Sequence, residues 1–222
     1  QRSEVRILSP RHSHFILGKK SGVSDILNLA KDYYESIFNN SGWAPFSFHS
    51  VHHTRSVVEK AQEWASASNL NEQASEALLL ASMFHDLGYL SRYDDHEAES
   101  IQMFSDFAEQ HSLSIEQQET VRRLIECTRK THSDFIDPLT KVMHDIDRAG
   151  MGMQDFIEQG LNLRKEWEFF KRLETNDAEW FAFQIEYLKK THFKTEHGLQ
   201  NYNDQKEKNL QSLTDLLANL AV

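Results

Sequence analysis

The sequence has little of what builds β-rich, disulfide-bonded or membrane-spanning proteins. Its 222 residues include one cysteine, Cys127, so no internal disulfide can form, which is typical of a reducing compartment. Only 3 prolines and 8 glycines are present, and so few turn-forming residues favour long helices over hairpins. The most apolar stretch, residues 77–84, is far shorter than the ~20 residues of a membrane span. We therefore expect a soluble, helical, cytoplasmic protein.

Positive charge is also scarce. Lysine and arginine total 24 against 34 aspartates and glutamates, which gives a net charge of −10 at pH 7. An acidic chain is poorly suited to bind nucleic acid or an anionic membrane, so we expect neither as a partner. A local basic pocket for a phosphate group remains compatible with this charge. The 39% hydrophobic and 11% aromatic content is enough to form a buried core.

Hydrophobic periodicity predicts a series of helices joined by short loops. Apolar residues recur at intervals of three and four, which places them on one face of a helix. Ser114 with Gln117, and Asp137 followed by Pro138, are typical helix starts. The expected helices cover about residues 23–40, 50–68, 71–84, 95–111, 114–128, 137–148, 153–173, 176–192 and 197–220. We predict one all-α domain over residues 21–222, preceded by a loosely ordered arm of residues 1–20.

Histidine is abundant, with 12 residues. His49 and His53 are four apart, so on a helix they share a face. His85 and Asp86 end the most apolar predicted helix, and a second acidic stretch with a histidine follows at residues 143–150. Two neutral imidazoles and two carboxylates suit a divalent ion such as manganese, iron, cobalt or zinc. The order of these residues therefore predicts a metal site.

Several short motifs occur in an order that resembles the HD-domain superfamily of metal-dependent phosphohydrolases. They are residues 48–58 (FHSVHHTRSVV), 85–89 (HDLGY), 96–100 (HEAES), 125–128 (IECT) and 145–152 (DIDRAGMG). Residues 164–166, Trp180 and residues 191–195 are similar to a small stand-alone subgroup of that superfamily. The sequence departs from the family pattern at two places. The family has asparagine at the position of Ser50, and the family has a leucine-containing sequence at the position of residues 148–149. The resemblance covers nearly the whole chain and implies a single-domain helical bundle of the HD type.

The resemblance implies that His53, His85, Asp86 and a closing aspartate bind the metal. Asp145 and Asp147 are two residues apart, so on a helix their side chains point ~200° away from each other and only one can reach the ion. The match to the family motif assigns Asp147, with Asp145 as the alternative. The ion can be manganese, iron, magnesium, cobalt or zinc, and the sequence does not decide among them.

The resemblance also implies catalytic residues. His49 is similar to the histidine that protonates the leaving oxygen in related phosphodiesterases, a role that suits a side chain titrating near neutral pH. Glu97 is a candidate general base or a residue that orients a ligand, and Asp86 is a candidate for catalysis as well as for metal binding. A structural role for His49 and a solvent-facing position for Glu97 are the alternatives.

Three further residues are candidates for substrate binding. Arg129 and Lys130 can bind phosphate oxygens, although charges at these positions can also face solvent. His96 matches a position that holds a second metal in two-metal relatives. Thr128 stands where those relatives have another histidine, and threonine is a poor ligand for such an ion. We therefore expect one tightly held metal ion.

The resemblance implies hydrolysis of a phosphate mono- or diester, by metal-activated water, with a nucleotide-like small molecule as substrate. One alternative is a catalytically silent HD-type module that binds a ligand. Another is a di-iron HD-type oxygenase. Such an enzyme needs two further histidines as ligands, and this chain has Thr128 at the position of one of them. A homodimer is compatible with the sequence, which leaves the oligomeric state open.

Overall fold

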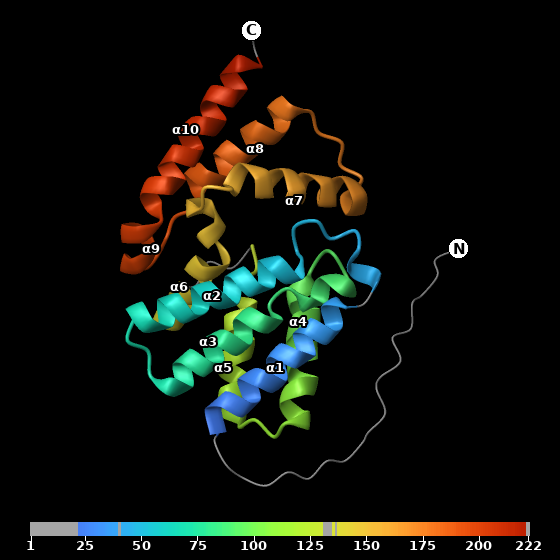
Figure 1. Cartoon of the computed structure of the whole chain (residues 1–222), viewed down its shortest axis with the longest axis vertical. Coiled ribbons are helices and arrows are strands. Elements are labelled where there is room, and N and C mark those ends of the chain that lie inside the picture. The colour runs from blue at the N-terminus through green and yellow to red at the C-terminus, as the bar shows by residue number, and fades with distance from the viewer. Residues whose placement is uncertain (1–21, 40, 131–134, 136, 221–222) are drawn as a thin grey trace, which may run out of the picture.

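The computed structural model describes residues 22–39, 41–130, 135 and 137–220. These residues form ten α-helices and no strand, which confirms the predicted all-α fold (Figure 1). Within the same residues, no helix combines the length and the apolar character needed to cross a membrane. The arm predicted for residues 1–20 lies outside the described residues.

Among the first six helices, five pack around the remaining one, α3, which lies at their centre. They are α1 (Gly22–Phe38), α2 (Val51–Ala67), α3 (Glu72–Phe84), α4 (His96–Gln110), α5 (Ile115–Glu126) and α6 (Pro138–Asp147), which occupy the lower part of Figure 1. Helix α3 contacts each of the other five. The neighbouring helices bury α3 over most of its length. This burial is expected of the most apolar segment of the chain.

The remaining helices form the upper part of the molecule in Figure 1. They are α7 (Phe156–Lys171), α8 (Asp177–Lys190), α9 (Glu196–Asn201) and α10 (Asn203–Asn219). Helix α10 packs on α8 and on the short 3-10 turn Ala149–Gly152 that follows α6. One continuous cluster of buried residues extends from Ala30 on α1 to Leu213 on α10, so the two parts share a core.

The C-terminal region differs from its prediction, which was a single helix over residues 197–220. The structure instead breaks this segment at Tyr202, between α9 and α10. The Tyr202 side chain is buried beside Trp64, and its hydroxyl donates a hydrogen bond to Glu63 of α2 at 2.8 Å. This anchor to α2 redirects the chain where the leucine spacing alone predicts a continuous helix.

Asp145 of α6 joins the two parts of the molecule. Its fully buried carboxylate accepts hydrogen bonds from the backbone amides of Lys194 and Thr195, both at 2.8 Å. The Thr195 hydroxyl donates a further bond at 2.7 Å. Gly198 also approaches this carboxylate, since a Cβ there would lie only 2.7 Å from Asp145 Oδ2. The segment between α8 and α9 is therefore held against α6.

Gly88 allows helix α4 to pack directly on the turn that follows α3. A Cβ at this position would lie 2.0 Å from the carbonyl oxygen of His96 and 2.7 Å from the amide nitrogen of Ser100. The Ser100 hydroxyl donates to the carbonyl of His85 at 2.6 Å and accepts from the Gly88 amide at 2.9 Å. This contact sets the start of α4 beside the end of α3.

We predict that Gly88→Ala destabilises the protein by about 1–3 kcal/mol, because the added methyl group has no space without backbone movement. Gly150→Ala is the matched control, since a Cβ at Gly150 has no heavy atom within 4 Å. Urea unfolding followed by circular dichroism measures both variants. Equal stability of the two variants would show that the α4 contact tolerates an added side chain.

Candidate metal centre

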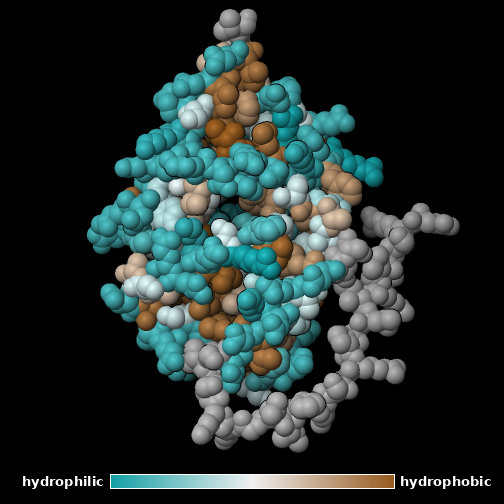
Figure 2. All heavy atoms as spheres, viewed as in Figure 1, coloured by the Kyte–Doolittle hydropathy of each residue, from teal (hydrophilic) through white to brown (hydrophobic). Residues whose placement is uncertain are grey.

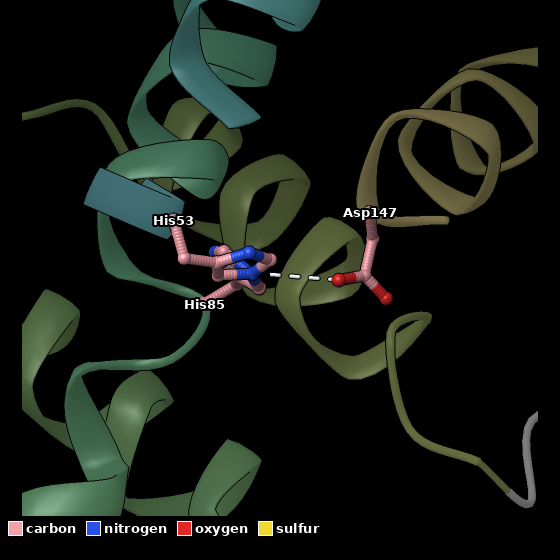
Figure 3. A group of neighbouring side chains, drawn as sticks. All are labelled: His53, His85 and Asp147. Atoms are coloured by element: carbon pink, nitrogen blue, oxygen red, sulfur yellow. Dashed lines mark ion pairs between the residues drawn. The ribbon is translucent and has the colours of Figure 1, made fainter. Parts of the chain in front are cut away.

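Four side chains from three parts of the chain, namely α2, the end of α3 and α6, converge at the end of α3. His53 lies in the first turn of α2, which begins after its N-cap residue Ser50. His85 is the C-cap residue of α3, and Asp147 is the last residue of α6. Figure 3 shows His53, His85 and Asp147 pointing toward one another, and their ligand atoms all lie within 4.8 Å of each other. Asp86, the fourth residue, contacts both histidines.

The spacing of these atoms fits a shared metal ion. The Nε2 atoms of His53 and His85 lie 3.3 and 3.1 Å from Asp86 Oδ2. His85 Nε2 also lies 3.5 Å from Asp147 Oδ1 (Figure 3). Ligand atoms that are each bound about 2.0–2.2 Å from one ion stand about 2.8–3.6 Å apart, from octahedral to tetrahedral geometry, and this range includes these separations.

His85 supplies the observation that favours a cation at this position. Its ring is fully buried, and its Nε2 atom has no hydrogen-bond partner among the described residues. The opposite ring nitrogen, Nδ1, lies 3.0 Å from the carbonyl oxygen of Ser82, which favours a proton on Nδ1. Nε2 then faces the carboxylates of Asp86 and Asp147 without a well-aligned hydrogen bond to either, whereas buried polar atoms normally have one. The residues present therefore fit a divalent metal ion.

Charge within the cluster is balanced between acids and imidazoles. Burial disfavours the imidazolium of His85, but Asp86 and Asp147 outweigh it and hold the pKa of His85 well above its usual value. Burial also disfavours the Asp86 carboxylate, yet His85, His53 and His96 hold the pKa of Asp86 well below its usual value. The carboxylates therefore stay ionised and attract positive charge to this point.

The structure separates the two aspartates of α6. Asp147 faces the cluster through Oδ1, while its Oδ2 accepts a bond from Arg148 at 3.0 Å. Asp145 points toward the Lys194–Thr195 segment and also accepts from His144 Nδ1 at 3.0 Å. The predicted ~200° separation of these side chains explains why only Asp147 reaches the histidines.

Asp86 also faces a second position through its other oxygen. Asp86 Oδ1 lies 3.4 Å from His96 Nε2. Glu97 lies behind this ring, 3.7 Å from His96 Nδ1. The Thr128 hydroxyl donates to the carbonyl of Ile125 at 2.8 Å and so bonds within its own helix turn. His96 and one Asp86 oxygen are therefore the groups that this position offers, and Thr128 adds no strong metal ligand.

Comparison with known protein families agrees with this geometry. The family model described as the HD domain matches residues 51–152, from the start of α2 to the turn after α6. Residues 51–152 are therefore similar to this family, and we refer to them as the HD domain because of that match. HD domains are generally metal-dependent phosphohydrolases, and the match includes His53, His85, Asp86 and Asp147. No curated protein and no solved structure matches the chain significantly.

A residue beyond the HD domain holds His49, and sequence analysis gave it no role. Glu166 of α7 is fully buried and pairs with His49 Nδ1. Its other carboxylate oxygen accepts from the backbone amides of Phe48 and His49 at 2.9 and 3.0 Å. The Tyr93 hydroxyl donates a fourth hydrogen bond at 2.8 Å. No spacing rule links Glu166 to a histidine 117 positions earlier, and its signal in the sequence is its place in the motif of residues 164–166, to which no role was assigned.

This contact fixes which atom of His49 faces the cleft. Because Nδ1 is paired with Glu166, Nε2 is the ring nitrogen left for a molecule bound beside the HD domain. The Tyr89 ring stacks between His49 and His96, with centroid distances of 3.9 and 3.6 Å. Burial lowers the pKa of His49 below its usual value, although Glu166 opposes this effect by stabilising the imidazolium.

The cluster opens into a cleft of about 1150 Å³ between the HD domain and helices α7 and α8. Arg129 lines this cleft but is paired with Asp95 and with Glu126, the latter at 2.7 Å. Lys130 has no ion-pair partner among the described residues. Of the two predicted phosphate-binding cations, Lys130 is therefore the one with its charge available.

We predict that Asp147→Asn removes most of the bound metal, while Asp145→Asn retains it, because only Asp147 faces His85. Asp145→Asn instead lowers the free energy of unfolding by about 1–3 kcal/mol, since buried amides lose a charged acceptor. Metal content is measured by plasma mass spectrometry after loading with manganese, and stability by urea unfolding. Metal loss in Asp145→Asn together with retention in Asp147→Asn would reverse the assignment.

Proposed function

We propose that this protein is a metal-dependent phosphohydrolase that cleaves a phosphate mono- or diester of a nucleotide-like small molecule. His85 Nε2 carries this proposal, because it is buried among two carboxylates and a second histidine without a well-aligned hydrogen bond. A divalent ion held by His53, His85, Asp86 and Asp147 would supply the charge that polarises the phosphoryl group and activates water. The adjoining cleft is large enough for a nucleotide-sized molecule.

The residues around the cluster orient the reacting groups. Asp86 Oδ1 points away from His53 and His85, where it can accept a hydrogen bond from the attacking water. Glu97 lies 3.5 Å from Arg129 and 3.7 Å from His96. We propose that Glu97 orients the His96 ring, because its carboxylate is buried behind that ring.

His49 is suited to exchange a proton with the leaving group. His49 lines the cleft. Its Nδ1 donates a hydrogen bond to Glu166, which leaves Nε2 as the ring nitrogen available to a bound molecule. In the fraction of molecules whose His49 ring is protonated, the Nε2 proton moves to the leaving oxygen when the phosphorus–oxygen bond breaks, and the ring becomes neutral. Glu166 stabilises the protonated ring before this step and fixes its orientation throughout.

The test of this function is a screen of the manganese-loaded protein against nucleoside monophosphates, cyclic nucleotides and sugar phosphates. We expect hydrolysis of at least one class, and we expect His85→Ala/Asp86→Ala to abolish both bound metal and hydrolysis. His111→Ala, at the end of α4 away from the cluster, is the control. A metal-loaded protein that hydrolyses none of these esters would favour a silent binding module, and a coupled di-iron spectrum would favour an oxygenase.

A second prediction separates the role of His49 from general damage. We expect His49→Asn to lower kcat by about 10²-fold on an ester with a poor leaving group such as a nucleoside, since general acids contribute on this order. The loss on a p-nitrophenyl ester is smaller, because that leaving group needs little protonation. Glu166→Gln follows the same pattern, and Glu158→Gln, exposed on the same helix, leaves both rates near those of the unaltered protein.

Steady-state kinetics on the two esters measures this contrast. Equal loss on both esters in His49→Asn and Glu166→Gln would show that the pair supports the fold or the binding site and does not deliver a proton.

A further inference from the structure

Two lysines from different parts of the chain line the cleft and approach the same aromatic ring. Lys130 follows α5 in the HD domain, and Lys171 is the last residue of α7. The Nζ atoms of both lie 5.1 Å from the centroid of the Trp167 indole. Trp167 and Lys171 are four residues apart on α7 and so lie on the same side of that helix. All three residues line the cleft that contains the metal cluster.

Most other cations of this cleft already have carboxylate partners. Arg148 pairs with Asp147, Arg129 with Glu126 and Asp95, Lys60 with Glu63, and Lys190 with Glu186. Lys194 has no carboxylate partner in the described part of the chain, but it lies alone over the Phe135 ring at 4.5 Å. The Lys130–Lys171 pair is therefore different, because it combines weak pairing with a second like charge.

Placing these two ammonium groups together is unfavourable without an anion. Lys130 has no ion-pair partner within the described ranges, and Asp94, the carboxylate nearest to Lys171 at 3.3 Å, has a side chain that is 88% exposed. An ion pair with so exposed a group contributes little. The Lys130 side chain is exposed by surface area, but desolvation at the cleft, followed by repulsion from Lys171, lowers its pKa. A chain with a net charge of −10 thus concentrates positive charge at one point of its cleft.

The pair adjoins the residues that surround the metal cluster. Lys171 also lies over the Tyr93 ring at 5.4 Å, and Tyr93 donates to Glu166, the partner of His49. Lys130 follows Arg129, which lies 3.5 Å from Glu97 beside His96. A ligand at the metal cluster can therefore extend along the same cleft toward the two lysines.

We propose that Lys130 and Lys171 bind a second phosphate group of the substrate, distinct from the one attacked at the metal centre. This inference rests on the proposed function and narrows its substrate class to small molecules that carry two phosphate groups. Trp167 holds both ammonium groups through cation–π contacts and so positions them to face one anion. Because its contacts here are with charges, the site recognises a dianion more than an aromatic base.

The first test measures anion binding without turnover. Calorimetry follows the binding of pyrophosphate to metal-free protein carrying His85→Ala, so that the metal centre contributes nothing. We expect binding that weakens about tenfold or more when Lys130→Gln/Lys171→Gln is added, since a charge-assisted hydrogen bond contributes roughly this much. The control, Lys165→Gln, removes an exposed lysine of the same helix and leaves the affinity unchanged.

Circular dichroism establishes that the double variant is folded before it is compared. Absence of pyrophosphate binding to the folded parent, or equal binding by the parent and the double lysine variant, would overturn the proposal. Binding that depends on the lysines supports the site even if the protein hydrolyses no phosphate ester, so failure of the proposed function remains distinguishable from failure of this inference.

The second test uses the complete, manganese-loaded protein. For a nucleoside bisphosphate and the matching monophosphate, the ratio of the two kcat/KM values measures how strongly the second phosphate is recognised. We expect Lys130→Gln/Lys171→Gln to lower this ratio about tenfold, mainly through KM of the bisphosphate. An unaltered ratio in an active double variant would show that the second phosphate binds elsewhere.

Discussion

The structure depends on the placement of one buried carboxylate, Asp86, among three imidazoles. One of its oxygens lies within 3.3 Å of His53 and His85, and the other lies 3.4 Å from His96. A carboxylate this deeply buried needs positive charge or strong hydrogen bonds near it. The histidines meet that need in part. Because they come from different helices, their contacts with Asp86 bring together the start of α2, the end of α3 and the start of α4. The same convergence leaves His85 Nε2 facing two carboxylates without a well-aligned hydrogen bond, which is why a metal ion suits this site.

Helix α6 serves this centre and the rest of the fold through two aspartates placed two residues apart. Asp147 turns toward His85, whereas Asp145 accepts the amides of Lys194 and Thr195. The two side chains point in different directions because of helix geometry alone. A shift of the segment between α8 and α9 would therefore be transmitted to the helix that carries Asp147. The C-terminal segment and the metal cluster are thus both in contact with one helix.

The features that the sequence predicted are those set by local spacing. The helices from α1 to α8 follow from apolar periodicity and caps, and the His53, His85, Asp86 and Asp147 cluster follows from motif order. The break at Tyr202 was missed because it depends on a hydrogen bond to Glu63, 139 residues earlier, which no local pattern records. Glu166 was missed for the same reason. Its partner lies 117 residues away, and only the docking of α7 on the HD domain brings the two together.

This difference suggests how the chain divides its chemistry. The HD domain contains the residues proposed to hold the metal, and these are identifiable from sequence because the family match covers them. Helix α7 lies beyond that match. It contributes Glu166, which pairs with His49, and Lys171, which like Lys130 contacts the Trp167 ring. We propose that metal binding is a property of the HD domain, whereas proton delivery and substrate choice depend on the residues that α7 adds to the cleft. Chains that share the HD motifs but differ along this helix would keep the reaction and change the substrate.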